Sequence, residues 1–260
     1  MYHFEKVTII TGGSKGIGEG CARVFVEAGA KVVICARGKE AGEALADALT
    51  AKGPGECHFE VCDVSQPEQI KQVLDRTIER YGRLDCLINN AGWHPPLRSI
   101  DDFSVEEFRD LLQLNLVSVF AGCKFALPHL RKTRGSIINI SSLVGMIGQE
   151  WGTTYAATKG AINALTKALA IDEARHGVRI NVVLPGNIVT PMRIKAVAGA
   201  ENPRELNDRL ESRQWVGRSG TIEETGYACL FLASDGASFI TGVELPVSGG
   251  AELGYGLKAL

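Results

Sequence analysis

Tyr155 and Lys159, four residues apart, are the pair in this sequence best suited to proton transfer. A spacing of four places both side chains on one face of a helix, one turn apart. A free tyrosine has a pKa of about 10 and is a poor base at pH 7, but a nearby ammonium group favours the phenolate. We therefore expect Lys159, together with a second positive charge at the site, to lower the pKa of Tyr155.

Ser142 precedes Tyr155 by 13 residues and lies at the end of a predicted strand. Other polar and glycine-rich segments also follow predicted strands, namely 11–18, 89–92 and 185–187. In an open parallel sheet, ligands bind outside the carboxyl ends of the strands. These segments are therefore expected to meet at one edge and to form one site with Ser142.

Short apolar runs alternate along the chain with longer helical patterns. The predicted strands are 6–11, 31–36, 57–62, 84–89, 135–140, 179–184 and 243–247, and the predicted helices are 16–29, 40–52, 67–81, 104–131, 155–176 and 221–232. This alternation predicts an α/β fold: a doubly wound, parallel, seven-stranded Rossmann sheet with helices on both faces. We expect residues 1–260 to form a single domain, in which the polar, irregular segment 190–220 is a substrate lid.

Composition excludes several classes of protein. The 260 residues carry a formal net charge of −2, which argues against nucleic acid as the main partner. No apolar run approaches the roughly 18 residues of a membrane span, and the first residues show no secretory signal. The seven cysteines include no CxxC pair, so neither a disulfide framework nor a metal site is expected. We expect a cytoplasmic protein.

The first predicted strand runs directly into a glycine-rich loop and a helix. Glycines let the backbone approach a pyrophosphate, and the helix N-terminus offers free N–H groups, so the segment predicts a dinucleotide site formed by Gly12, Ser14, Lys15, Gly16, Ile17 and Gly18. The second strand ends at Arg37 rather than at a carboxylate. Because Arg37, helped by Lys15, suits a 2′-phosphate, we expect NADP(H), with NAD possible.

At this point the chain resembles the short-chain dehydrogenase/reductase family, from about Glu5 to Tyr255. The resemblance rests on Thr11–Gly18, Asn89–Gly92, Asn115, Ser142, Tyr155 with Lys159, and Pro185-Gly186, in order and at the family's spacing. It implies that Tyr155 is the general acid/base, that Ser142 holds the substrate oxygen, and that Lys159 bonds the nicotinamide ribose. It also implies that Asn115 holds a water in the proton path. The implied cofactor contacts further include Asp63, Val64, Asn90, Ala91, Gly92, Pro185, Gly186, Ile188 and Thr190.

The family resemblance also implies a homotetramer, packed partly through the helices that contain Asn115 and Tyr155. Several stretches are similar to a subgroup of the family that acts on 17β-hydroxysteroids and L-fucose: 92–96, 141–149, 185–188 and 249–256. These stretches make His94, Gln149, Asn187 and Tyr255 candidate substrate contacts, with Tyr255 reaching a neighbouring subunit. Arg193 stands in the lid where that subgroup has an aromatic residue, which favours a polar or anionic substrate.

The sequence thus predicts an oxidoreductase that transfers a hydride between NADP(H) and a secondary alcohol or carbonyl. The alternative within the enzyme class is an NAD-dependent 17β-hydroxysteroid or L-fucose (sugar) dehydrogenase. The alternative from another class is a non-catalytic dinucleotide-binding sensor, which would have no need of Asn115, Ser142, Tyr155 and Lys159 together.

Overall fold

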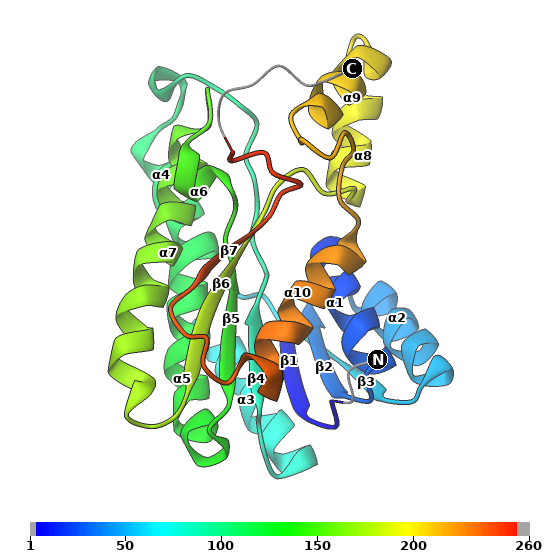
Figure 1. Ribbon diagram of the computed structural model, residues 1–260, viewed down its shortest axis with the longest axis vertical. Coiled ribbons are helices and arrows are strands. Elements are labelled where there is room, and N and C mark those ends of the chain that lie inside the picture. Colours follow the sequence, from blue (N-terminus) through cyan, green and yellow to red (C-terminus); the bar gives the residue numbers. More distant parts are fainter. Residues whose placement is uncertain (1–3, 254–260) are drawn as a thin grey trace.

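The computed structural model describes residues 4–253, and its centre is a sheet of seven parallel strands (Figure 1). The strands lie in the order β3-β2-β1-β4-β5-β6-β7. Their bounds are Val7–Thr11 (β1), Lys31–Ala36 (β2), Glu56–Val61 (β3), Cys86–Asn89 (β4), Ser136–Ile140 (β5), Arg179–Pro185 (β6) and Glu244–Val247 (β7). The predicted seven-stranded parallel sheet is confirmed, and each strand begins and ends within two residues of its predicted position.

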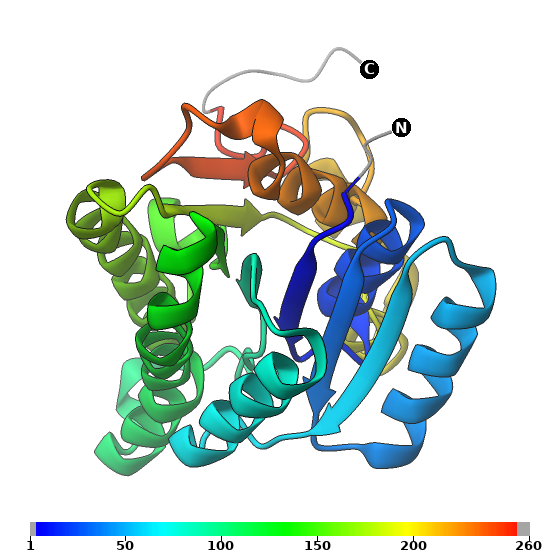
Figure 2. The ribbon, with the colours of Figure 1, turned by 90° about the horizontal axis from the view of Figure 1, so that it is seen from below.

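Helices cover both faces of this sheet (Figure 2). One face carries α3 (Pro67–Tyr81), α5 (Ser118–Thr133) and α7 (Thr153–Ala174), and the other carries α1 (Gly16–Glu27), α2 (Lys39–Lys52) and α10 (Ile222–Ala233). Successive residues of a strand enter opposite cores: Ile9 packs with the first group of helices and Ile10 with the second. Strands that are buried on both faces must be apolar throughout, which is why they read as continuous apolar runs.

The helical stretch 105–133 is interrupted by one wider turn. It consists of α4 (Val105–Leu112), the π turn η2 (Gln113–Val117) and α5, where the sequence predicted one helix over 104–131. Its first turn is closed by a capping box, in which Ser104 and Glu107 each bond the other's backbone N–H, as the sequence suggests.

Against the expectation from the sequence, this stretch is long and apolar enough, by length and composition, to cross a membrane. Half of the 18-residue window that passes this test is buried inside the fold. Its helix α5 packs against α3, β4 and β5. That is the position of a core helix in a doubly wound sheet.

The segment 190–220 was expected to lack regular elements, and this expectation is wrong. It contains α8 (Pro191–Ala198) and α9 (Pro203–Ser212), which Figure 1 shows at one end of the molecule beyond the sheet. Each helix has proline in its first turn and a polar N-cap, Thr190 for α8 and Asn202 for α9. Neither helix has a buried residue, so no apolar stripe marks them in the sequence. The remaining short elements are η1 (Ile100–Asp102), α6 (Val144–Ile147) and η3 (Asp235–Ala237).

Candidate active site

The carboxyl ends of β1, β4, β5 and β6 bring the predicted site residues to one edge of the sheet. The loops that follow β1 and β4 are joined directly. Thr11 Oγ1 accepts hydrogen bonds from the backbone N–H groups of Asn90 and Ala91, each at 3.0 Å. The Asn90 side chain donates back to Thr11 O at 2.9 Å and to Gly12 O at 3.2 Å. Asn90 therefore fixes the glycine loop rather than lying free beside it.

Tyr155 lies in the first turn of α7, and Lys159 lies one turn later on the same face. The Lys159 Nζ atom is 5.6 Å from the centroid of the Tyr155 ring, and it donates a hydrogen bond to Ile140 O at 3.0 Å. That carbonyl belongs to the last residue of β5, two residues before Ser142. The Ser142 hydroxyl is close enough to the Tyr155 phenol to lower its pKa. The strand end and the helix thus place the serine, the phenol and the ammonium group together, as the spacing predicts.

The pKa values of this pair differ from the expectation in an instructive way. Burial raises the pKa of Tyr155 to about 12, although the hydrogen bond from Ser142 opposes the rise. Burial likewise lowers the pKa of Lys159 to about 8. In the protein without cofactor the ammonium group of Lys159 does not contribute to the pKa of Tyr155, and burial sets its direction. The lowering predicted for Lys159 together with an oxidised nicotinamide stays a prediction. Desolvation dominates both groups.

Asn115 lies within the π turn η2 and is fully buried. Its Oδ1 accepts from the backbone N–H of Trp93 at 2.9 Å, and its Nδ2 donates to Trp93 O at 2.9 Å and to Thr158 Oγ1 at 3.2 Å. The side chain thus holds the loop after β4 against α7. The predicted role of Asn115 in holding a water stays a prediction.

His94 follows the loop residue that Asn115 holds, and its ring packs against the phenol of Tyr155. The two ring centroids are 4.2 Å apart, with an angle of 41° between the planes. The His94 Nδ1 atom lies 2.6 Å from Pro95 O, and Nε2 lies 3.2 Å from Gln149 Oε1. His94 and Gln149, both predicted as substrate contacts, are therefore brought together beside Tyr155, whose ring His94 contacts.

The glycine-rich loop has the geometry that a dinucleotide requires. Gly12 and Gly16 have φ angles of 64° and 60°, which disfavour any other residue. A Cβ atom on Gly18 would lie 2.4 Å from Gly12 O, so the loop packs tightly onto the first turn of α1. In the described structure the N-cap residue Lys15 makes no side-chain bond to that helix. The first N–H groups of α1 are therefore available for a phosphate, and the residues fit the predicted cofactor.

The predicted adenosine-side residues follow β2 and β3. Asp63 Oδ1 accepts from the N–H of Ser65 at 3.0 Å and from its hydroxyl at 2.8 Å. These bonds hold the pKa of Asp63 below its usual range, and the charge of Arg37 lowers it further. Arg37 is exposed at the end of β2, and Val64 is buried. Two strand ends thus bring Asp63 near enough to Arg37 for their charges to interact.

The segment after β6 faces the glycine loop. A Cβ atom on Gly16 would lie 3.6 Å from the Thr190 side chain, and one on Gly186 would lie 2.8 Å from Ser248 Cα. Ile188 is buried and forms a parallel bridge with Gly220. The predicted cofactor residues of this segment therefore lie between the glycine loop and the start of the segment 190–220, which was predicted to be a lid.

Asn187 and Arg193 are hydrogen-bonded to each other, with Arg193 Nε donating to Asn187 Oδ1 at 3.1 Å. Both were predicted as substrate contacts. Their hydrogen-bonding atoms instead contact each other and α9. The predicted contact Tyr255 lies outside the described residues. Within residues 4–253 no group of three His, Cys, Asp or Glu side chains is arranged to hold a metal ion.

Three supporting residues were missed from the sequence. Thr158 receives the Asn115 amide, Ile140 receives the Lys159 ammonium through its backbone carbonyl, and Gly145 lets α6 approach α7. A Cβ atom on Gly145 would lie 2.8 Å from the carbonyl carbon of Lys159. Of the three, only Gly145 could have been noticed in the sequence, because it is a glycine between the strand that ends at Ile140 and the helix of Tyr155.

Comparisons with known proteins agree with this geometry. The sequence profile of a family described as "Enoyl-(Acyl carrier protein) reductase" matches residues 12–252. The L-fucose dehydrogenase of Oryctolagus cuniculus is 50% identical over 251 residues, which cover 96% of this chain and 86% of the relative.

Two solved structures show the same fold along almost the whole chain. Levodione reductase superposes with a TM-score of 0.93 at 32% identity, covering 98% of this chain and all of the other. L-Sorbose reductase from Gluconobacter frateurii, complexed with NADPH and L-sorbose, superposes with a TM-score of 0.91 at 26% identity. That match covers 96% of this chain and 97% of the other.

Proposed function

The chain belongs to the short-chain dehydrogenase/reductase family, and we propose that it transfers a hydride between NADP(H) and a secondary alcohol or carbonyl group of a sugar such as L-fucose. The observation that carries this proposal is the meeting of Ser142, Tyr155 and Lys159 at the strand edge that also holds the glycine loop. A sugar substrate is supported by the names of two similar proteins, an L-fucose dehydrogenase and an L-sorbose reductase.

In the proposed mechanism the chain's own residues orient the substrate and move one proton. Ser142 and Tyr155, whose hydroxyl groups interact in the protein alone, would hold the substrate oxygen between them. In oxidation the Tyr155 oxygen accepts the proton of the substrate hydroxyl, and in reduction it returns that proton. The bound nicotinamide supplies the hydride acceptor or donor.

Binding of the cofactor is expected to change the proton affinity of the phenol. Burial alone raises the pKa of Tyr155 to about 12, too high for a base at neutral pH. Lys159, whose ammonium group lies 5.6 Å from the centroid of the Tyr155 ring, would hold the nicotinamide ribose. That cation, with the positive charge of the oxidised nicotinamide, favours the phenolate. Tyr155 is therefore expected to act as a base only when the oxidised cofactor is bound.

A preference for NADP(H) is proposed from two exposed cations. Arg37 directly follows β2, at a position where a carboxylate would repel a 2′-phosphate, and Lys15 lies in the glycine loop. A planar guanidinium group can bind a phosphate through two parallel N–H···O hydrogen bonds, that is, as a bidentate pair. The cofactor test is the ratio of kcat/KM for NADP to that for NAD. We expect a ratio above ten in the natural protein and a fall of about tenfold or more in Arg37→Ala; a natural ratio below one contradicts the preference.

The substrate test is a panel of sugars, 17β-hydroxysteroids and simple ketones assayed with both cofactors. Activity on L-fucose or a related sugar supports the proposal, whereas activity confined to steroids supports the apolar alternative. One observation favours the latter: Trp93 and Trp151 are 47% and 53% exposed in the loops that flank His94 and Gln149. No activity with any compound, together with cofactor binding, would support the sensor.

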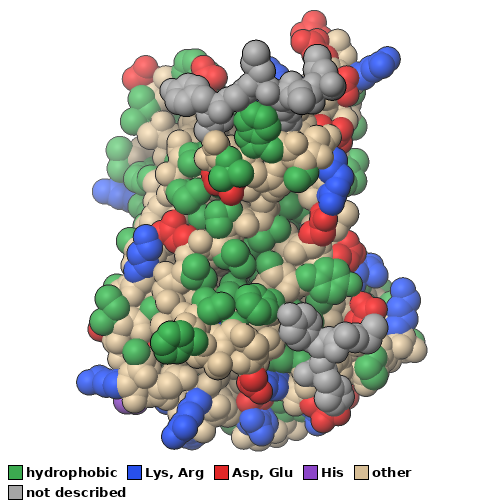
Figure 3. Space-filling view, in the orientation of Figure 1, with side chains coloured by type: hydrophobic (Ala, Val, Ile, Leu, Met, Phe, Trp, Pro, Cys, Tyr) green, Lys and Arg blue, Asp and Glu red, His purple; other side chains and the backbone are tan. Residues whose placement is uncertain are grey.

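A homotetramer packed through the helices of Asn115 and Tyr155 is also proposed. Phe120 and Ile171 are 51% and 78% exposed on α5 and α7, and a cavity of about 360 Å³ between these helices is lined partly by Leu127, Pro128 and Leu169. Apolar side chains also lie on a different face, the one with β7 and α10 in front, which Figure 3 shows. Four copies in light scattering are expected, and a monomer at working concentration would contradict this assembly.

A cytoplasmic location is proposed from the cysteines. All seven are free thiols, and six of them are buried. Free thiols suit a reducing compartment. Imaging of the tagged full-length chain in its native cell tests this, and an organellar or membrane pattern would contradict it.

A further inference from the structure

One arginine joins the two lid helices to the end of β6. The Arg193 side chain, on α8, is only 11% exposed. Its Nε donates to Asn187 Oδ1 at 3.1 Å, and its Nη2 donates to Asn207 Oδ1 at 2.8 Å. Asn187 follows β6, and Asn207 lies in the middle of α9. A single guanidinium group therefore connects three segments that the sequence separates.

Asn187 extends the connection on its other side. Its Nδ2 donates to Leu210 O, on α9, at 3.0 Å. Both ends of this amide are therefore used, one toward α8 and one toward α9. A planar guanidinium with several fixed donors can satisfy such an arrangement, whereas a lysine offers only one nitrogen.

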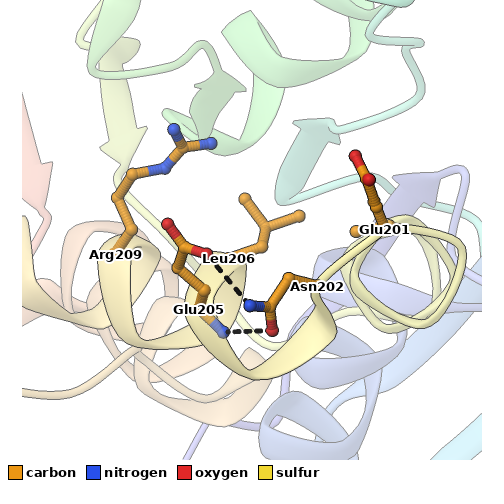
Figure 4. Close-up of a pocket in the computed structure, with 6 residues that line it drawn as sticks. Glu201, Asn202, Glu205, Leu206 and Arg209 are labelled. Atoms are coloured by element: carbon orange, nitrogen blue, oxygen red, sulfur yellow. Dashed lines mark hydrogen bonds between the residues drawn. The ribbon is translucent and has the colours of Figure 1, made fainter.

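This polar connection matters because the two helices of the lid bury no side chain of their own. Neither α8 nor α9 contains a buried residue, whereas Ile194 and Met192 are more than half exposed. The inner side of α9 borders a cavity of about 620 Å³, lined by Ala200, Glu201, Asn202, Glu205, Leu206 and Arg209 (Figure 4). A lid without an apolar core opens at low free-energy cost unless hydrogen bonds restrain it.

The charge of Arg193 is also balanced within the lid. The Glu211 carboxylate lies 3.9 Å from Arg193 Nη2, and the two amide oxygens accept from the same guanidinium group. A cation that already faces a carboxylate and two acceptors is a poor partner for a substrate anion. The expectation that Arg193 favours an anionic substrate is therefore not supported by its contacts.

We propose that Arg193 is a positioning residue, which clasps α8 and α9 to the end of β6 and thereby sets the affinity for a neutral substrate. The part of this inference that concerns substrate rests on the proposed function, but the clasp itself does not. Asn187 and Asn207 complete the clasp, and the charge of the guanidinium group is not offered to the ligand.

The clasp is tested by amide hydrogen exchange on the full-length protein without substrate or cofactor. Arg193→Met should speed exchange in residues 191–212 by at least tenfold, and Asn207→Leu should do the same. Because both changes break one clasp, the double variant should exchange no faster than either single variant. Arg204→Met is the matched control, since that arginine lies on α9 with a side chain 93% exposed. Lid exchange in Arg193→Met equal to that of the control would overturn the clasp, as would additive effects.

The consequence for substrate is tested by kinetics with NADP. Arg193→Met should raise KM for L-fucose at least fivefold with kcat changed less than threefold, and Arg193→Lys should recover part of the loss. The KM of a sugar acid such as galacturonate should rise by the same factor. A loss confined to the acid would overturn the inference and make Arg193 a counter-ion. If the natural protein turns over neither sugar, the proposed function fails while the exchange result still decides the clasp.

Discussion

The helix that carries Tyr155, the proposed acid/base residue, and the helices α8 and α9 of the proposed lid are built on opposite principles. Helix α7 buries eight residues, among them Thr158 and Lys159, whereas α8 and α9 bury none. Tyr155 is held by a buried helix, a strand end and the ring of His94, so its position is fixed by packing. The lid is held by polar contacts at Arg193. The contrast indicates that the chemistry is fixed by the core, while selectivity can change without loss of the fold.

The largest predicted effect is a loss of activity from a substitution beside Tyr155, in the part of the site that the core positions. Ser142→Ala removes the hydroxyl that bonds Tyr155 and is expected to hold the substrate oxygen. We expect kcat/KM to fall by about 100-fold or more. Ser136→Ala is the control, because Ser136 is a buried serine at the opposite end of the same strand. Equal activity of the two variants in initial-rate assays would show that Ser142 has no part in the chemistry.

The second prediction concerns the same region and the pH dependence of its unfolding free energy, which the buried Lys159 should affect. Its folded pKa of about 8 lies below its usual 10.5, so below pH 8 the protein bears the full cost of a buried ammonium group. As pH rises toward 10.5 the folded state releases this proton first and the cost disappears. From pH 7.5 to 9.5, the natural protein should therefore gain about 2 kcal/mol of unfolding free energy relative to Lys159→Met.

Urea unfolding at the two pH values measures this gain. Tyr155 acts in the opposite direction, since its folded pKa of about 12 lies above its usual 10. Its stabilisation is lost only as pH rises from about 10 to 12, outside the measured window. A constant difference between the two proteins across the window would contradict the buried charge of Lys159.

His94 tests whether the loop after β4 helps to fix the phenol. His94→Ala removes a ring that packs 4.2 Å from that of Tyr155. Aromatic pairs contribute about 0.5–1.5 kcal/mol, so we expect kcat to fall up to about tenfold. His94→Phe keeps the ring and should retain most of kcat. If His94→Ala instead raises KM alone, His94 contacts only the substrate, as the sequence suggested.

The smallest effect is expected in the lid. Ile194 is 55% exposed on α8, so Ile194→Ala should change the unfolding free energy by less than about 0.5 kcal/mol. The same change should alter KM several-fold across a substrate panel while kcat with the best substrate is kept. A loss of stability comparable to a core substitution would show that the lid is packed like the rest of the fold.

The same contrast explains what could be predicted from the sequence. The strands were found because residues such as Val33 and Ile34 must be apolar on both faces of the sheet. The position of the candidate site at one edge of the sheet was predicted from the polar and glycine-rich segments that follow the strand ends. The helices α8 and α9 were missed because exposed helices carry no apolar period.

Other features depend on tertiary contacts that no local pattern contains. The π turn around Asn115 is one, since its side chain bonds Trp93 and Thr158 from two other segments. The upward shift of the Tyr155 pKa is a second such feature. The four-residue spacing predicts that Lys159 is near, but it does not predict how deeply the phenol is buried. The bond between Asn187 and Arg193 likewise depends on where α9 lies.

The central claim is that the phenol of Tyr155 transfers the proton while the rest of the site only binds and orients. Tyr155→Phe removes one oxygen from a ring that His94 still holds. NADPH binding, followed by nicotinamide fluorescence, should be retained within about threefold, while turnover of the best substrate falls by about 1,000-fold or more. Turnover within tenfold of the natural protein, with binding intact, would contradict the account.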